Sequence, residues 1–401
     1  MPINYESLFL ESIEQLKTEG RYRVFNNLER KAGSFPMAKS RITDRTVTVW
    51  CSNDYLGMGQ HPKVISAMSE AIGRLGAGAG GTRNISGTHN AIVTLEQTLS
   101  ELHNKEAALV FTSGYIANEA TLATLCTMLK NCIVYSDVYN HASMIHGIRS
   151  SKVEKHIFRH NDAEHLESLL KQADPMRPKI IAFESVYSMD GDIAPIKVFC
   201  DLADKYNAIT YLDEVHAVGM YGARGGGVAE RDGVMDRVTI IQGTLGKALG
   251  GASGGFTSGR KEIIEMLRQR SRPYLFSNTL APSITGASIA VLDLLSETTA
   301  LRDKLEENTK YFREKMTALG FDIKPGEHPI VPIMLYDAVL SQTMATKLLD
   351  EGIYVIGFFF PVVPKGQARI RVQISAAHDM EHLDKAIAAF TKVGKELGVI
   401  K

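Results

Sequence analysis

From about residue 105 onward, short apolar runs alternate with segments whose apolar residues recur at helical spacing. Such runs predict strands, and the segments between them predict helices. The strands are expected at Ala107–Phe111, Cys132–Tyr135, Ile180–Phe183, Ile209–Leu212 and Val238–Ile241, and the helices near Ile116–Leu129, Ala163–Gln172 and Ile196–Asp204. Strands separated by helices are typical of a mostly parallel sheet with helices on both faces, so the predicted fold class is α/β.

A polar or glycine-bearing turn follows each of these apolar runs. The turns are Thr112-Ser113-Gly114, Ser136-Asp137, Glu184-Ser185, Asp213-Glu214 and Gln242-Gly243. Ligands of open α/β sheets bind outside the carboxyl ends of the strands. We therefore expect the chemistry of this protein at these five turns.

The chain on either side of this region has a different pattern of predicted helices and strands. Apolar residues at the N-terminus mark one face of an amphipathic helix: Tyr5, Leu8, Phe9, Ile13 and Leu16. A long helical pattern near Ala281–Leu319 precedes strands at Ile330–Met334, Ile353–Ile356 and Ala368–Gln373 and helices near Ser341–Asp350 and Met380–Leu397. We expect an N-terminal helix and arm over residues 1–60, a large domain over 61–290 and a small α/β domain over 291–401.

Composition and charge narrow the function classes. Lysine and arginine number 45, as do aspartate and glutamate. No net charge therefore attracts the chain to nucleic acid or to an anionic membrane. The longest charge-free stretch, Pro273–Leu292, contains Pro282 and several hydroxyl residues and is a poor membrane span. Neither nucleic acid nor a membrane is an expected partner.

The cysteines and the N-terminus favour a cytoplasmic protein. The four cysteines, Cys51, Cys126, Cys132 and Cys200, match no common zinc spacing. We expect them to stay reduced, and we expect no metal site. Glu6 and Glu11 stand where a signal peptide would be basic and then apolar.

The sharpest chemical signal is the segment Gly243–Gly251, in which Lys247 lies among small residues directly after a predicted buried strand. The spacing is not that of a P-loop. A solvated lysine in a glycine-rich loop is one interpretation. The other is a lysine held against a ligand, with Thr244 and backbone N–H groups able to bind an anion and the amine able to form a Schiff base.

Four further segments are ambiguous when each is taken alone. In Asp213-Glu214-Val215-His216, Asp213 could hold a protonated ring nitrogen, or it could simply cap a helix while His216 lies on the surface. The hydroxyl groups of Ser185–Asp192, including Ser188, could be ordinary loop chemistry. Gly114 and Tyr115 open a predicted helix and suit a phosphate, and His141, which opens another, offers a flat ring for stacking.

Together these groups are what pyridoxal phosphate needs, namely a Schiff-base lysine, a partner for the ring nitrogen, a phosphate cradle and a stacking ring. With these motifs the chain resembles the α-oxoamine synthases. These are fold-type I (aspartate aminotransferase-like) pyridoxal-phosphate enzymes that join an amino acid to an acyl-CoA. The resemblance covers nearly all of the 401 residues.

The resemblance implies a role for each matching residue. Lys247 would carry the cofactor as a Schiff base and remove a proton from the amino acid. Asp213 would pair with the ring nitrogen, His216 with the ring oxygen, and His141 would stack on the ring. Both histidines would also stabilise charge on the acyl oxygen. Gly114, Tyr115 and Thr244 would bind the phosphate, and Ser188 would belong to the same cofactor shell.

Two more implications concern the assembly and the amino acid. The family's Phe-Ser-polar turn comes from the neighbouring subunit, and Phe276-Ser277-Asn278 matches it. The resemblance therefore implies a homodimer with shared active sites. Arg371 matches the arginine that clamps the carboxylate of the amino acid, a contact suited to the planar guanidinium.

The two halves of the chain resemble different members of the family. Residues 1–240 resemble 5-aminolevulinate synthase through Gly20–Arg23, Val49–Tyr55, Gly80–Gly87 and Glu214–Gly222. Residues 241–401 resemble glycine C-acetyltransferase (2-amino-3-ketobutyrate CoA ligase). The segments that carry this second resemblance are Arg268–Leu280, Gly357–Ser375 and Ala376-Ala377-His378.

The acyl donor distinguishes the two activities, because succinyl-CoA ends in a carboxylate and acetyl-CoA in a methyl group. By resemblance, Arg23, Thr82 and Asn84 hold the succinyl carboxylate, and Asn53, Ser136 and Lys155 match further substrate positions. Val362 replaces the threonine of the synthases. The expected activity is condensation of glycine with succinyl-CoA to 5-aminolevulinate, CoA and CO2, a step of tetrapyrrole and heme synthesis. The alternatives are glycine C-acetyltransferase, an aminotransferase and a non-catalytic homologue.

Overall fold

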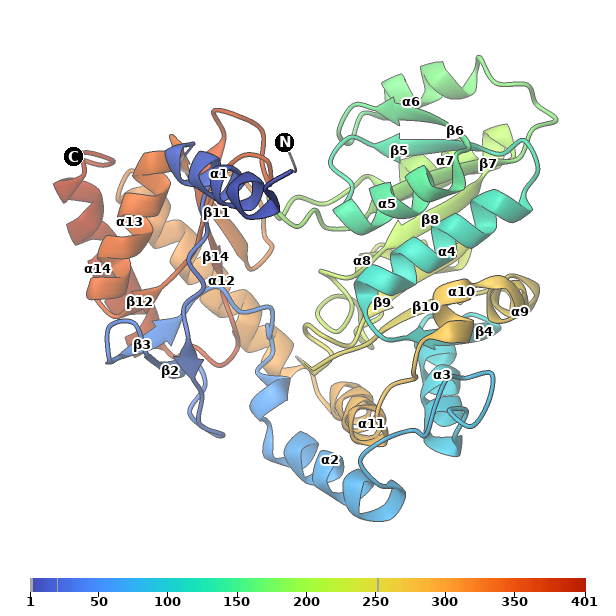
Figure 1. Cartoon of the computed structure of the whole chain (residues 1–401), viewed down its shortest axis with the longest axis horizontal. Helices are drawn as coiled ribbons and strands as arrows, with labels where there is room; N and C mark the ends of the chain where they lie inside the picture. The colour runs from blue at the N-terminus through green and yellow to red at the C-terminus, as the bar shows by residue number, and fades with distance from the viewer. Residues whose placement is uncertain (1–2, 20, 251) are drawn as a thin grey trace. The chain divides into compact units, whose positions relative to one another are not determined.

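The computed structural model describes residues 3–19, 21–250 and 252–401 (Figure 1). Gly20 and Gly251, which belong to two of the motifs above, lie outside the described residues. The chain forms two compact units. The large unit comprises Asn53–Ser188 and Asp192–Lys304, and the small unit comprises Met1–Ser52, Met189–Gly191 and Leu305–Lys401.

A seven-stranded sheet forms the centre of the described part of the large unit, in the order β4-β10-β9-β8-β7-β5-β6. Its strands are β4 (Ala107–Phe111), β5 (Ile133–Asp137), β6 (Glu154–Phe158), β7 (Lys179–Glu184), β8 (Ile209–Asp213), β9 (Ile240–Thr244) and β10 (Gly255–Gly259). Neighbours from β9 to β6 pair in parallel, whereas β10 is antiparallel to both β4 and β9. The predicted α/β fold with a mostly parallel sheet is confirmed, as are the five predicted strands.

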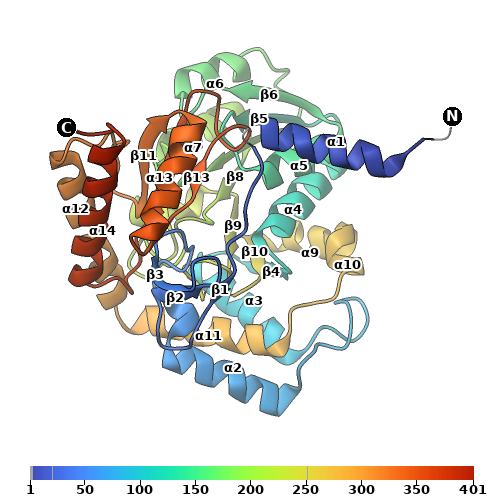
Figure 2. The ribbon, with the colours of Figure 1, turned by 60° about the vertical axis from the view of Figure 1, so that its left-hand side comes forward.

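Both faces of this sheet are buried, which explains why its strands read as continuous apolar runs. Ile180 and Ala182 pack in the core on one face, with α4 (Gly114–Met128), α5 (Ala142–Ser151) and α9 (Lys261–Arg270). Ile181 and Phe183 pack on the other face, with α6 (Ala163–Leu170) and α7 (Ile196–Tyr206). Helices α4 and α5 run side by side, as do α2 (Pro62–Leu75) and α11 (Pro282–Glu297) (Figures 1 and 2). Helix α3 (Asn90–Leu102) packs beside β4.

The small unit contains two further sheets. One has the order β1-β2-β3-β12 (Leu28–Glu29, Met37–Ser40, Arg45–Val49 and Ile353–Tyr354), and the other has the order β11-β14-β13 (Ile330–Tyr336, Ala368–Gln373 and Gly357–Phe358). Helices α1 (Tyr5–Thr18), α13 (Ala338–Asp350) and α14 (Met380–Glu396) belong to the same unit. The fully buried Trp50 stacks on His378 with ring centroids 3.8 Å apart.

The helical pattern near Ala281–Leu319 forms two helices, α11 and α12 (Ala300–Ala318), bent by 79°. Thr298 lies between them in an extended conformation with φ −156° and ψ 150°, so the helix ends there. No single described helix is long and apolar enough to span a membrane, and α11 and α12 pass such a test only as this bent pair.

His103 gives the large unit a measurable pH response. Its buried ring contacts the Ser258 hydroxyl of β10 (3.2 Å) and the Gly226 carbonyl oxygen (3.1 Å). Burial lowers the pKa of His103 from 6.5 to about 3, against the opposing hydrogen bond to Gly226. Below pH 6.5, His103 therefore binds a proton in the unfolded chain but stays neutral in the folded chain.

We predict that the free energy of unfolding falls by about 1.4 kcal/mol per pH unit as the pH drops below 6.5, because of His103 alone. Urea titrations of wild type and His103→Gln between pH 7 and 5.5 would give this contribution as the difference between the two slopes. An equal slope in wild type and His103→Gln would contradict the prediction.

Candidate active site

A pocket lies where the parallel strands of the large unit end. It is lined by residues that end or follow β4, β5, β7, β8 and β9. They are Gly114, Tyr115, Asn118, His141, Ser143, Glu184, Asp213, Val215, His216, Thr244 and Lys247. The pocket thus brings together the lysine, the aspartate, both histidines and the phosphate candidates named from the sequence.

Asp213 ends β8 and is 3% exposed. Its carboxylate accepts hydrogen bonds from the Asn118 side-chain amide (2.6 Å) and from the Val215 N–H (2.8 Å). Burial raises the pKa of Asp213, and these hydrogen bonds and the charge of Lys247 oppose that shift. A cation in the pocket beside this carboxyl group would therefore be strongly favoured.

Lys247 and His216 are in direct contact. The Lys247 amine lies 2.9 Å from Nε2 of His216, and Nδ1 of His216 lies 2.9 Å from the Tyr55 hydroxyl. An ammonium group has donors only, so with Lys247 charged Nε2 accepts and Nδ1 carries the proton. The Tyr55 oxygen is then the acceptor, so the charge on Lys247 sets which tautomer the imidazole adopts.

His141 caps the N-terminus of α5. The backbone N–H of His141 donates to the Glu184 carboxyl group at 2.6 Å, and the ring Nδ1 lies 2.7 Å from the Ser143 hydroxyl. Glu184 is fully enclosed, and burial, followed by the charge of Asp213, raises its pKa well above the usual range. The backbone of the stacking candidate is therefore anchored to the end of β7.

The start of α4 forms a cradle of small groups. Ser113 caps the helix by accepting from the Ile116 N–H (3.2 Å), and Gly114 follows it. A Cβ at Gly114 would lie 3.2 Å from the Thr244 side chain, and one at Gly255 would lie 2.5 Å from the Gly114 backbone. This close packing brings Thr244 to the N–H groups of a helix N-terminus, an arrangement that suits a phosphate.

Thr82 and Asn84 lie in the loop that follows α2. Within that loop the buried Arg83 forms a bidentate pair with Glu96 of α3 (2.6 and 3.0 Å). Thr82 also forms a β-bridge with Asn278. The loop of Thr82 and Asn84, which are predicted to bind the acyl group, therefore lies beside Ser277-Asn278, the turn predicted to serve the neighbouring subunit. Neither segment lines the pocket described above.

The remaining candidates of the large unit lie outside the pocket lining. Asn53 and Ser188 are half-buried, at the start of the unit and in the loop after β7. Ser136 is buried in β5, where its hydroxyl accepts from the Asn140 amide (2.9 Å), and Lys155 is exposed on the edge strand β6.

The small unit carries three candidates. Arg371 of β14 is buried, donates to the Gln373 side chain (3.1 Å) and lies 4.9 Å above the Phe358 ring. Arg23 is exposed in the segment between α1 and β1, and Val362 is 40% exposed in the turn after β13.

Comparison with known proteins assigns the family. A model of the aminotransferase class I and II family matches residues 45–390. A 5-aminolevulinate synthase of Bradyrhizobium diazoefficiens is 48% identical over 400 residues, covering 99% of this chain and 98% of that protein. One from Rhizobium meliloti is 50% identical over 391 residues, 96% of each chain. The chain belongs to this aminotransferase family, among its α-oxoamine synthases.

Solved structures of such synthases share the fold. Serine palmitoyltransferase of Sphingomonas wittichii aligns with a TM-score of 0.92 and 29% identity, over 99% of this chain and 98% of that one. An 8-amino-7-oxononanoate synthase of Francisella tularensis aligns with a TM-score of 0.74 and 25% identity, over 87% and 98%. The fold-type I pyridoxal-phosphate transferase fold predicted from the sequence is therefore confirmed.

The pocket of this α-oxoamine synthase fits pyridoxal phosphate in its donor set. The buried Asp213 carboxyl group calls for a cationic partner such as a protonated pyridine nitrogen, and the cradle at Gly114 suits the phosphate. Sequence reasoning missed three residues of this site: Asn118, Glu184 and Tyr55. Glu184 was recognised only as part of a turn, and Asn118 lies on a helix that reads as ordinary core.

We predict that Tyr55→Phe lowers kcat/KM by about 2- to 10-fold, because His216 loses one neutral hydrogen bond. Steady-state kinetics with the holoenzyme would measure the change. Tyr135→Phe is the matched control, since the buried Tyr135 hydroxyl has no hydrogen-bond partner among the described residues. Equal behaviour of the two variants would contradict a role for the Tyr55 contact.

Proposed function

We propose that this chain is a 5-aminolevulinate synthase, which condenses glycine with succinyl-CoA and releases 5-aminolevulinate, CoA and CO2 in tetrapyrrole and heme synthesis. The observation that carries the proposal is the convergence of Lys247, His216 and the buried Asp213 in one pocket. It is supported by curated 5-aminolevulinate synthases, 46–50% identical, which match 96–99% of the chain. A cytoplasmic location accords with these bacterial relatives.

Pyridoxal phosphate is the cofactor of this family, and a structure of S. paucimobilis serine palmitoyltransferase contains it. When bound, the cofactor withdraws electrons from the α-carbon of the amino acid. In this chain Lys247 would hold it through the amine and Asp213 would keep its ring nitrogen protonated. His216 would donate to its ring oxygen, while Gly114, Tyr115 and Thr244 would bind its phosphate.

Proton transfer at the glycine α-carbon is assigned to Lys247. Once glycine is bound, the Lys247 amine is free to act as the base, and His216, 2.9 Å away, holds it in place. His141 would cover the opposite side of the ring, and both histidines would stabilise negative charge on the acyl oxygen. Arg371 would orient the glycine carboxylate.

A homodimer with shared active sites accompanies this function. Ser277 and Asn278 do not line the pocket of their own chain, which accords with a role in the active site of the neighbouring subunit. Large apolar side chains are exposed beside Ser277, in the loop of Thr82 and Asn84, and on α1. They are Phe276 (68%), Ile85 (72%) and Phe9 (67%). A second copy covering them would remove this surface from water.

Succinyl-CoA is the donor that the charged groups favour. Arg23 is exposed and suited to a terminal carboxylate, and Thr82 and Asn84 would add neutral hydrogen bonds. Val362 supplies no hydroxyl, which favours the second candidate, a glycine C-acetyltransferase acting on acetyl-CoA. A charge-assisted hydrogen bond, at about 1.5–3 kcal/mol, outweighs a neutral one at about 0.5–1.5 kcal/mol.

The first test is CoA release by the cofactor-loaded protein with glycine and either succinyl-CoA or acetyl-CoA, with identification of the product. We expect a preference for succinyl-CoA and formation of 5-aminolevulinate. Preferential use of acetyl-CoA with release of 2-amino-3-oxobutyrate would establish the second candidate instead.

We predict that Arg23→Leu lowers kcat/KM for succinyl-CoA by about 10- to 100-fold and changes that for acetyl-CoA by less than about threefold. Val362→Thr should raise kcat/KM for succinyl-CoA by about 2- to 10-fold. Arg45→Leu, which removes an exposed arginine of β3, serves as the control. A parallel loss for both donors in Arg23→Leu would contradict carboxylate recognition.

A further inference from the structure

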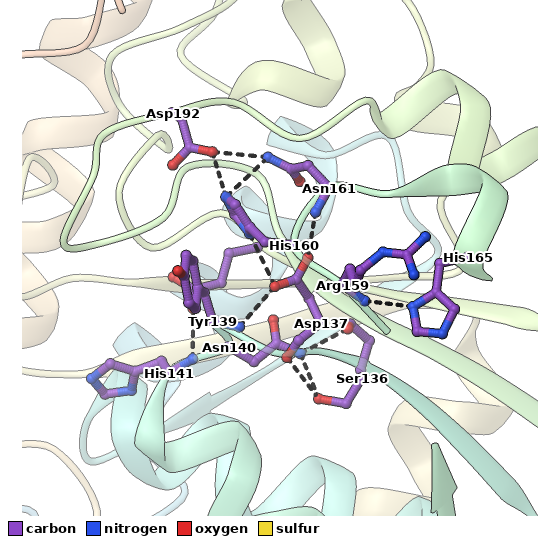
Figure 3. Close-up of polar contacts among 12 residues, drawn as sticks. Ser136, Asp137, Tyr139, Asn140, His141, Arg159, His160, Asn161, His165 and Asp192 are labelled. Atoms are coloured by element: carbon purple, nitrogen blue, oxygen red, sulfur yellow. Dashed lines mark hydrogen bonds and ion pairs between the residues drawn. The ribbon is translucent and has the colours of Figure 1, made fainter. Parts of the chain in front are cut away.

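His160 lies between two carboxylates in the large unit, outside the pocket lining (Figure 3). Its Nδ1 is 3.1 Å from Asp137 of β5, and its Nε2 is 2.6 Å from Asp192. A carboxylate accepts and does not donate, so both ring nitrogens must carry protons. The geometry therefore describes an imidazolium held by two negative charges.

The surroundings of His160 favour that charge. The Asp137 carboxylate is completely buried, and the His160 side chain is 21% exposed. The rings of Tyr139 and Tyr187 lie 4.5 and 4.4 Å from the imidazole, and Asp137 and Asp192 are the charged groups in contact with it. Burial opposes the charge, but the two carboxylates outweigh it and raise the pKa of His160 to about 9.

One arm of this network leads to His141. Asp137 accepts from the N–H groups of Tyr139 (2.8 Å) and Asn161 (2.9 Å), which closes the turn between β5 and α5. In the same turn, Asn140 donates to the Ala182 carbonyl oxygen (2.7 Å), and the next residue, His141, is bound by Glu184. The Asp137 side chain thus fixes the segment that presents the His141 ring.

The other arm leads to the loop that carries Ser188. Asp192 accepts from His160 and from the Asn161 amide (2.9 Å), and its carbonyl oxygen accepts from the Tyr187 N–H (3.1 Å). The β-bridge between Val186 and Ile193 closes the base of the same loop. His160 therefore joins two loops that come from different strands and that both supply predicted cofactor contacts.

We propose that His160, with Asp137 and Asp192, is a positioning residue that locks the His141 turn and the Ser188 loop together and so fixes the stacking ring of His141. The inference rests on the proposed function, since it takes His141 and Ser188 as cofactor contacts. His160 acts through its neighbours and touches no reacting atom.

Hydrogen–deuterium exchange tests the first half of this inference without turnover. In His160→Gln, a neutral side chain can satisfy only one of the two carboxylates. We expect amide exchange in residues 137–141 to accelerate by about tenfold or more. His165→Gln is the matched control. His165 of α6 accepts from the backbone N–H of Arg159, the residue before His160, at 2.9 Å, and no contact joins it to Asp137 in Figure 3. Unchanged exchange at residues 137–141 in His160→Gln would overturn the inference.

The second half is tested on the cofactor itself. His160→Gln should change the visible circular dichroism of bound pyridoxal phosphate, speed its dissociation several-fold and lower kcat, with the KM for the acyl-CoA within about twofold of wild type. Asp192→Asn combined with His160→Gln should be no worse than His160→Gln alone if the residues act as a unit. A loosened turn with unaltered cofactor dichroism and dissociation would contradict the positioning role. Failure of the proposed function would instead appear as absent CoA release in the wild type, with the exchange result intact.

Discussion

Asp213 carries its carboxyl group at the end of a central strand, where a charge costs several kcal/mol unless partners surround it. Asn118 and the Val215 N–H satisfy part of this requirement, and Lys247 contributes positive charge. Glu184, paired with Asp213 in the sheet register, adds a second buried carboxyl group. The pocket therefore contains two buried carboxyl groups that a bound cation would stabilise, and Lys247, His141 and His216 lie around them.

The parallel sheet explains how such distant residues meet. Strands β5, β7, β8 and β9 run in one direction, so their carboxyl ends share an edge, and the segments after them deliver His141, Asp213 with His216, and Lys247. Second contacts then orient each group. Tyr55 holds His216, Glu184 holds the His141 backbone, and His160 joins the turns behind them. The site is a set of short loops fixed by buried polar contacts.

The sequence predicted the central strands because each buries both faces and therefore reads as an apolar run. It did not predict β10, whose residues Gly255–Gly259 have little apolar surface, or the edge strand β6, whose residues are largely polar. The helical pattern near Ala281–Leu319 did not reveal the break between α11 and α12, which the structure places at the extended Thr298. In the site, motif residues with distinctive chemistry were recognisable, whereas Asn118, Glu184 and Tyr55 act through contacts that only the fold creates.

The most direct test of this account asks where the cofactor is attached. The protein would be loaded with pyridoxal phosphate, reduced with borohydride, digested and mapped by mass spectrometry. The account predicts a phosphopyridoxyl group on Lys247 in the wild type and its loss in Lys247→Ala. Modification of another lysine, or stoichiometric labelling that persists in Lys247→Ala, would contradict the assignment of the site.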